Sequence, residues 1–294
     1  MFGIIQSLLE IIFPPVCLAC KKYLSSQTLR SKTWEENNKE IFLCENCESK
    51  IEINNSFFCP ECNRRLPFSS VIASPDNHRN EAISSQSVIA SPDNHQNEAI
   101  SRQFEINRLK PITYNLKPNP CHSESKFILA AASSYQNTIV REIIHSLKYG
   151  RATAALKPIE KIIKLYLEKI IPDSIVNSHN FVIVPIPLHS SKLRSRGFNQ
   201  SELIAKKLAA YCSLPTTHCL IRIKNTASQT KLKKEERLKN IENCFTLKNP
   251  QEISGKNIIL VDDVFTSGAT MREAVKILKN AGAKNIIGFV VAKV

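Results

Sequence analysis

The stretch "IILVDDVFTSGAT", residues 258 to 270, is an apolar run that ends in two acids and continues into small hydroxyl and glycine residues. The apolar run predicts a buried strand, and the residues after it predict a helix from about Ala269 to Ala281. The loop between them opens that helix, where free backbone N–H groups and the positive end of the helix dipole attract anions. The stretch therefore predicts an anion site after a strand.

The loop has the side chains of a phosphate cup. Thr266, Ser267 and Thr270 bring hydroxyl donors, and Gly268 lets the backbone approach a ligand closely. The Gly-x-x-x-x-Gly-Lys spacing of a Walker loop is absent. We therefore expect this loop to bind a phosphate group, and we do not expect it to be a nucleotide-binding P-loop.

Two adjacent carboxylates beside a phosphate repel it unless they face another group. Asp262 and Asp263 are suited to accept hydrogen bonds from sugar hydroxyls or to hold Mg²⁺ through its waters. Both roles fit a phosphorylated ribose. The alternative is an acid pair that only caps the following helix.

The chain after about residue 125 alternates strand and helix signals. "FILAAASSY" and "FVIVPIPL" predict strands, as does the closing "NIIGFVVAKV". Apolar residues at helical spacing lie between them, from Ile139 to Leu147 and from Ile159 to Tyr166. This rhythm predicts an α/β domain, a parallel sheet flanked by helices, with ligands at the carboxyl ends of the strands.

The cysteines are unevenly placed in the chain of 294 residues. Six of the ten form Cys-x-x-Cys pairs before residue 63: Cys17 and Cys20, Cys44 and Cys47, and Cys59 and Cys62. Such clustering favours metal ligation over disulfides, and the first two pairs supply the thiolates of a structural Zn²⁺ in a zinc ribbon. Redox pairs are the weaker alternative. The later cysteines are expected to be small buried apolar residues.

The rest of the N-terminal half predicts an organisation into three parts. Residues 1–66 combine an amphipathic helix with the zinc-ribbon module; its first residues lack the features of a signal peptide, and no window is apolar enough for a membrane span. Residues 67–122 contain a tandem duplication of "SVIASPDNH" and predict a disordered insert. Residues 123–294 form the α/β domain. We expect a cytoplasmic protein.

The formal net charge of +14 favours anionic partners, although an ordinary solvated surface is the simpler interpretation. Basic residues outnumber acids between Lys192 and Lys239. Part of this surface suits a bound diphosphate and part suits a nucleic-acid backbone, while aromatic residues that stack bases are sparse there.

Several motifs together resemble a known family. "VDDVFTSGAT" resembles the phosphoribosyl pyrophosphate signature of type I phosphoribosyltransferases. "RSRGFNQSELIA" from Arg194, "RIKNTASQTKLKKEERLKNIENCF" from Arg222, and "IIHSLKYG" from Ile143 are similar to the ComF family (competence protein F-like, GntX-like), as is the cysteine-rich start. The resemblance covers nearly the whole chain outside about residues 67 to 118.

The resemblance implies a type I phosphoribosyltransferase-like fold with an N-terminal double zinc ribbon, and it implies roles for matching residues. Asp262 and Asp263 would be catalytic and bind the ribose hydroxyls, while the loop would bind the 5-phosphate and Lys148 and Tyr149 the pyrophosphate. Arg196, Gln200, Arg222 and Gln229 would lie on or near a mobile region that closes over the site. The full substrate-binding set is Asp262, Asp263, Thr266, Ser267, Gly268, Ala269, Thr270, Lys148, Tyr149, Arg196, Gln200, Arg222 and Gln229.

The resemblance also implies cofactors and partners. A second zinc would take Cys59, Cys62 and Cys121 with His122, although another pairing among the cysteine motifs stays open. The activity would be Mg²⁺-dependent transfer from phosphoribosyl pyrophosphate, with a role in DNA uptake or nucleotide metabolism. The alternative is a competence protein that binds single-stranded DNA, works with DNA-uptake helicase machinery, and keeps the phosphoribosyl site as a sensor or remnant.

Overall fold

The computed structural model describes residues 16–24, 43–66, 125–149, 152–170, 180–226 and 241–294. Several predictions fall outside these ranges: the N-terminal amphipathic helix, the duplicated insert, Cys121, His122 and Gln229. These stay predictions. Within the described ranges, no helix combines the length and apolar character needed to cross a membrane.

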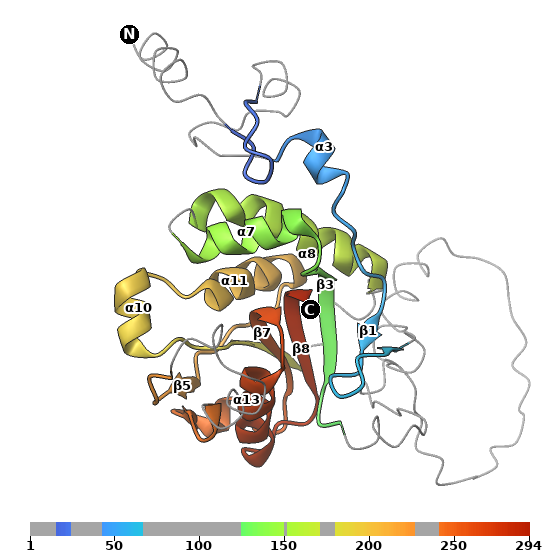
Figure 1. The fold of residues 1–294 in the computed structure, drawn as a ribbon. Helices are drawn as coiled ribbons and strands as arrows, with labels where there is room; N and C mark the ends of the chain where they lie inside the picture. The colour runs from blue at the N-terminus through green and yellow to red at the C-terminus, as the bar shows by residue number, and fades with distance from the viewer. Residues whose placement is uncertain (1–15, 25–42, 67–124, 150–151, 171–179, 227–240) are drawn as a thin grey trace, which may run out of the picture.

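A six-stranded sheet forms the centre of the α/β domain (Figure 1). In spatial order its strands are β2 (Arg65–Leu66), β1 (Phe57–Phe58), β3 (Ile128–Ser134), β8 (Ile286–Lys293), β7 (Asn257–Phe265) and β4 (Phe181–Pro185). The strands β3, β8, β7 and β4 run parallel, as the alternating pattern predicts. The sheet is mixed, however, because β1 pairs antiparallel with both β2 and β3.

Helices cover both faces of the sheet (Figure 1). On one face lie α7 (Thr138–Lys148), α8 (Ala152–Ile170) and α11 (Gln200–Cys212), and on the other lie α13 (Ala269–Asn280) and the antiparallel pair β5 (Leu220–Arg222) and β6 (Phe245–Leu247). The shorter helices are α3 (Glu45–Glu48), α10 (Ser190–Arg196) and η2 (Pro250–Glu252). The two layers bury two separate apolar clusters.

The strand β3 shows why both clusters form. Ala130 and Ala132 point to the layer of α7 and α8, whereas Leu129 and Ala131 point to the layer of α13. Successive side chains of a strand alternate between faces, so a strand covered on both sides is apolar throughout. The strand itself is confirmed where the run "FILAAASSY" predicts it.

The segment that follows the second cysteine pair continues the sheet. Phe57 and Phe58 pair with β3, and Asn54 donates from its backbone N–H to the carbonyl of Ala132 at 2.9 Å. The buried hydroxyl of Tyr166 on α8 donates to the carbonyl of Ser56 at 3.1 Å. Residues 50–66 are thus joined by hydrogen bonds to the α/β domain, and the predicted boundary after residue 66 stays a prediction.

Candidate functional site

A cleft of about 410 Å³ opens at the carboxyl ends of the parallel strands. The ends of β3, β4 and β7 line it with the C-terminus of α7, with α10 and with the N-termini of α11 and α13. Ligands of open parallel sheets bind at this edge, because the loops that follow the strands converge there. The anion loop predicted from the sequence forms one wall.

The loop after β7 has the predicted form. Gly268 is the N-cap of α13 with φ at 75°, a left-handed conformation that glycine adopts without steric cost. The Ser267 hydroxyl accepts from the N–H of Ala269 at 3.5 Å, a marginal distance. Thr266, Gly268, Ala269 and Thr270 line the cleft. The N-terminus of a twelve-residue helix therefore faces the cleft, which favours a bound anion there.

The two acids at the end of β7 both line the cleft, but they have different partners. Asp262 accepts at Oδ1 from the Ser201 hydroxyl and from the N–H of Asp263, both at 2.9 Å. Asp263 is 5% exposed, and its Oδ2 lies 2.8 Å from Nζ of Lys148. Desolvation and the neighbouring charge of Asp263 raise the pKa of Asp262 to about 7.

Lys148 stays a cation at neutral pH. Burial acts to lower its pKa, but the attraction and hydrogen bonding of Asp263, with help from Asp262, outweigh burial and raise the pKa. The three side chains form one charged group with two acids and one cation. Such a group suits a ligand that brings hydroxyl donors or a divalent cation.

Three further cations face the same cleft from two elements. Lys192 and Arg196 lie on α10, and Arg222 ends β5. Desolvation first, and then the charges of Arg222 and Arg196, lower the pKa of Lys192. Mutual repulsion among these cations is relieved when an anion enters, so this wall of the cleft favours a multiply charged anion.

The motif residues on α10 and α11 contact one another. Arg196 donates from Nη1 to Oε1 of Gln200 at 2.6 Å, and its guanidinium lies 5.9 Å from the ring centre of Tyr149. Tyr149 is 67% exposed at the end of α7. These contacts join two motifs that are about 50 residues apart in the sequence.

The cleft brings together almost the whole predicted set. Its wall includes Asp262, Asp263, Thr266, Gly268, Ala269, Thr270, Lys148, Tyr149, Arg196, Gln200 and Arg222. Ser267 lies in the same loop, between two residues of the wall, and Gln229 is outside the described residues. The structure thus places the predicted residues in one cleft, while their roles stay proposals.

Tyr135 and Ser201 line the cleft but were not singled out by sequence reasoning. Tyr135 directly follows β3, so the rule that strand ends meet at one edge could have found it. Ser201 holds Asp262 from the first turn of α11. Nothing in its spacing signals that contact, because it depends on how α11 packs on the sheet.

The first two cysteine pairs come together in one cluster with the spacing that a metal ion requires. The sulfurs of Cys17, Cys20, Cys44 and Cys47 lie within 4.8 Å of one another, and the Cys20 and Cys44 sulfurs are 3.8 Å apart. Four sulfurs about 2.3 Å from a central zinc stand about 3.8 Å apart at the corners of a tetrahedron. The donor set and its spacing fit a structural zinc.

The third pair forms a turn of the same shape as the first. The N–H of Cys59 donates to the carbonyl of Arg64, and the N–H of Asn63 donates to the carbonyl of Cys59, both at 2.9 Å. Cys17 makes the equivalent bonds with Lys22 and Lys21. The predicted partners of the third pair, Cys121 and His122, are outside the described residues.

The later cysteines that the structure describes are buried, as predicted. Cys212, Cys219 and Cys244 are at most 3% exposed. Burial raises the pKa of each thiol, to about 11 for Cys212 and Cys219. They stay protonated at neutral pH and pack as small apolar residues.

Comparisons with known proteins agree with this geometry. A phosphoribosyl transferase domain matches residues 152–293. The chain is 36% identical over 146 residues to competence protein ComFC of Bacillus subtilis (strain 168), covering 50% of this chain and 56% of that protein. It is 33% identical over 106 residues to competence protein F of Haemophilus influenzae, covering 35% of this chain and 46% of that protein.

Two further proteins either match a shorter part of the chain or are less similar to it. DNA utilization protein YhgH of Salmonella typhi is 35% identical over 105 residues, covering 35% of this chain and 45% of that protein. The chain thus spans about half the length of these relatives. A purine phosphoribosyltransferase from Pyrococcus horikoshii Ot3 shares 14% identity at a TM-score of 0.25, covering 56% of this chain and 87% of that chain. A likeness this low adds nothing to the assignment.

The mainly parallel sheet and the matched domain identify a fold of the type I phosphoribosyltransferase class. Within that class, the relatives support the ComF family that the motifs predict, and that prediction is confirmed.

Proposed function

We propose that the cleft binds phosphoribosyl pyrophosphate with Mg²⁺ and supports transfer of the phosphoribosyl group. The observation that carries this proposal is the position of Asp262 and Asp263, which line the cleft beside the N-terminus of α13. A ribose with a diol at one end and a phosphate at the other matches those two features together.

Different residues of the cleft bind different parts of the ligand. Asp262 and Asp263 accept hydrogen bonds from the ribose hydroxyls, and the loop from Thr266 to Thr270 holds the terminal phosphate. The cations Lys148, Lys192, Arg196 and Arg222 face the diphosphate. Holding the sugar at both ends fixes the bond between its C1 and the leaving group, which lowers the entropic part of the barrier.

The charges of the cleft suit the reaction. Breaking the bond to pyrophosphate leaves positive charge on the sugar and a multiply charged anion beside it. Acids on the sugar side and cations on the diphosphate side stabilise both charges as they develop.

Magnesium fits the donor set, because carboxylate oxygens are the hard ligands that it prefers. Asp262 and Asp263 would hold it directly or through its waters, and it would neutralise part of the pyrophosphate charge. The cysteine cluster suits zinc in a structural role, since all four positions of a tetrahedron are taken by protein ligands.

Calorimetric titration with phosphoribosyl pyrophosphate, with and without Mg²⁺, tests this proposal. We expect Mg²⁺-dependent binding that falls at least about tenfold when Asp262→Asn and Asp263→Asn are combined, because neutral amides lose charge-assisted bonds. Glu160→Gln is the control, since Glu160 forms an exposed ion pair with Lys207 on α11. Unchanged affinity in the double variant would rule out the proposed ribose site.

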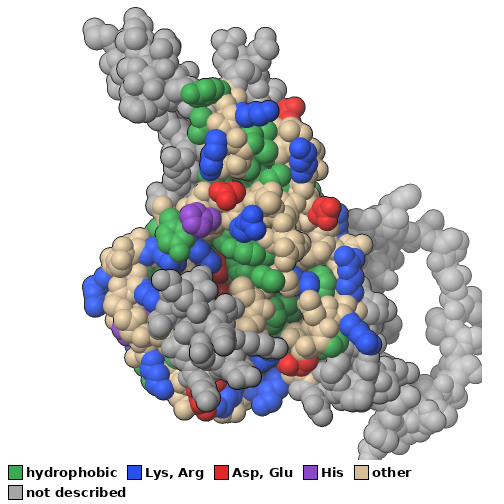
Figure 2. Space-filling model, in the orientation of Figure 1, with side chains coloured by type: hydrophobic (Ala, Val, Ile, Leu, Met, Phe, Trp, Pro, Cys, Tyr) green, Lys and Arg blue, Asp and Glu red, His purple; other side chains and the backbone are tan. Residues whose placement is uncertain are grey.

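The names of the relatives also favour a role in DNA uptake, which we include in the proposal. Single-stranded DNA binding is less favoured by the described surface. Lys206 and Lys207 form ion pairs with Glu202 and Glu160, while Lys192, Arg196 and Arg222 line the cleft. On the face in Figure 2, Lys and Arg are spread among acids and neutral side chains rather than gathered in one continuous patch.

A further inference from the structure

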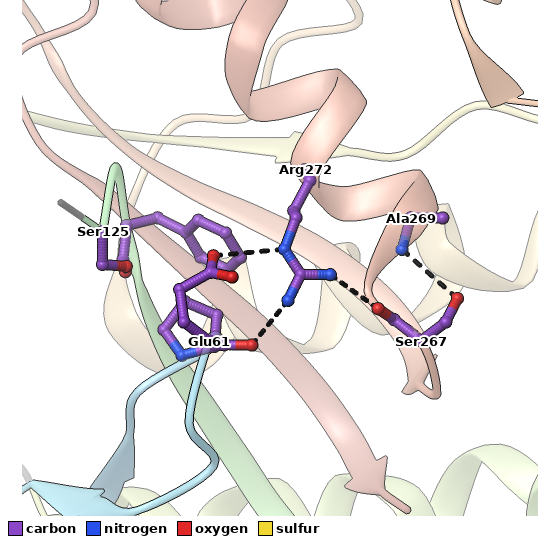
Figure 3. Close-up of polar contacts among 7 residues, drawn as sticks. Glu61, Ser125, Ser267, Ala269 and Arg272 are labelled. Carbon is purple, nitrogen blue, oxygen red and sulfur yellow. Dashed lines mark hydrogen bonds and ion pairs between the residues drawn. The ribbon is translucent and has the colours of Figure 1, made fainter. Parts of the chain in front are cut away.

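Arg272 on α13 joins the phosphate loop to the third cysteine pair (Figure 3). Its Nη1 donates to the carbonyl of Ser267, and its Nη2 donates to the carbonyl of Pro60, both at 2.6 Å. Its Nε donates to Oε1 of Glu61 at 3.1 Å. One guanidinium therefore connects the loop of the cleft to the turn between Cys59 and Cys62.

Several hydrogen bonds hold the turn that Arg272 contacts. Hydrogen bonds from Cys59 to Arg64 and from Asn63 to Cys59 close it on itself. Lys293 at the end of β8 donates from Nζ to Oδ1 of Asn63 at 2.7 Å. Since Lys293 pairs with Phe265 in the sheet register, the turn is fixed to the strand ends beside the cleft.

The contact with Ser267 determines where a donor of the loop points. The Ser267 carbonyl and the Gly268 N–H belong to one peptide unit, and in a trans peptide they point in opposite directions. When Arg272 holds the carbonyl on its own side, the N–H of Gly268 is turned away from Arg272. Gly268 lines the cleft, and our inference takes this N–H as a donor to an anion bound there.

Glycine at this position makes room for the guanidinium. A Cβ on Gly268 would lie 2.5 Å from Nη1 of Arg272 and 2.5 Å from Cζ of Phe265. The Arg272 guanidinium also lies 5.9 Å from the ring centre of Phe265. Arg272 and Phe265 thus pack against Gly268 and leave no space for a larger residue.

We propose that Arg272 is a positioning residue that anchors the phosphate loop to the Cys59–Cys62 turn and presets the Gly268 amide for the terminal phosphate of the ligand. The inference rests on the proposed function, because it assigns that phosphate to this loop. It predicts that the turn, which is about 200 residues earlier in the sequence, supports affinity for the phosphate end of the ligand and not for the pyrophosphate end.

Binding of ribose 5-phosphate and of pyrophosphate, each measured by calorimetry, separates this role from general stability. We expect Arg272→Ala to weaken ribose 5-phosphate binding about tenfold, because a charge-assisted contact that orients a donor is lost. Pyrophosphate binding should stay unchanged. Equal weakening of both ligands, or no weakening of either, would overturn the proposal.

Arg272→Lys distinguishes anchoring from simple charge. Lysine keeps the positive charge but lacks the planar fork that reaches three acceptors at once. We expect Arg272→Lys to weaken ribose 5-phosphate binding about as much as Arg272→Ala does, and wild-type affinity in the lysine variant would contradict anchoring. Lys276→Ala, on the same helix and at a residue paired with Glu273 at 4.0 Å, should bind both ligands normally.

Hydrogen exchange tests the anchor without any ligand. In Arg272→Lys, peptides that cover residues 265–272 and residues 59–63 should both exchange faster, because each loses a contact to the guanidinium. Unchanged exchange in both peptides would overturn the anchor. A wild-type protein that binds neither ligand but shows this exchange effect would contradict the proposed function and leave the anchor supported.

Discussion

Asp262 and Asp263 are neighbours in the chain but have different environments. Asp263 is paired with Lys148, while Asp262 is held by Ser201 and by a backbone N–H. The raised pKa of Asp262 follows from burial and from the charge next to it. At the residue scale, Asp263 is therefore paired with a cation, whereas Asp262 is held by hydrogen bonds and has a raised pKa.

Removing Lys148 tests the pairing. Lys148→Ala leaves the nearly buried Asp263 without its cation. We expect the free energy of unfolding to fall by about 1–3 kcal/mol. This is less than for a fully buried pair, because the side chain of Lys148 is 26% exposed. Urea unfolding measures the loss.

A double-mutant cycle provides the control for that experiment. Asp263→Asn combined with Lys148→Ala removes the unpaired charge, so the double variant should be more stable than the sum of the two single losses predicts. Strictly additive losses would show that the ion pair contributes no coupling.

Much of the site could be predicted at this scale, for a physical reason. Acids, hydroxyls and glycine in the loop are contiguous in the sequence, so their chemistry is visible together. Ser201 and Arg272 could not be predicted, because each contacts a residue that is distant in the sequence. Ser201 is about 60 positions from Asp262, and Arg272 is about 200 positions from Pro60.

At the scale of elements, the turn from β7 into α13 depends on Gly268. Its positive φ strains any other residue, and a side chain would also collide with Arg272 and Phe265. We expect Gly268→Ala to lower the free energy of unfolding by about 2–4 kcal/mol, the sum of strain and overpacking, measured by urea unfolding.

Gly255→Ala is the matched control for this prediction. Gly255 has φ at 71°, but a Cβ there would meet no atom within 4 Å. We expect a loss of about 1–2 kcal/mol from backbone strain alone. Equal losses at the two positions would show that the space around Gly268 is unimportant.

The long elements were predictable and the short ones were not. The strands β3 and β7 contain continuous apolar runs, and the helices α7 and α13 carry helical periodicity; each of the four has seven or more residues. The strands β1, β2, β5 and β6 have two or three residues each, too few for any period to appear. The antiparallel edge of the sheet was missed for this reason.

At the scale of the whole molecule, the cysteine module lies against a domain that already has two apolar clusters. Leu18 and Leu43 of the module belong to the same cluster as Ile143 of α7. A metal that orders residues 16–24 and 43–48 would therefore complete part of the core, because metal-binding free energy becomes folding free energy in such modules.

Metal analysis by mass spectrometry tests this role. Cys20→Ser combined with Cys47→Ser should lower the zinc content by about one ion per chain, since two of four ligands are lost. Cys212→Ser, at a buried cysteine outside the set, should keep the full zinc content. Equal zinc in all three proteins would contradict the assignment of this set.

The central claim is that the turn after β7 holds a ribose by its diol and its phosphate at the same time. Calorimetric comparison of ribose 5-phosphate with 2-deoxyribose 5-phosphate tests it most directly. We expect the deoxy sugar to bind about tenfold more weakly, since one hydrogen bond to a carboxylate is lost, and we expect Asp262→Asn with Asp263→Asn to abolish the difference. Equal affinity for the two sugars in the wild-type protein would contradict the account.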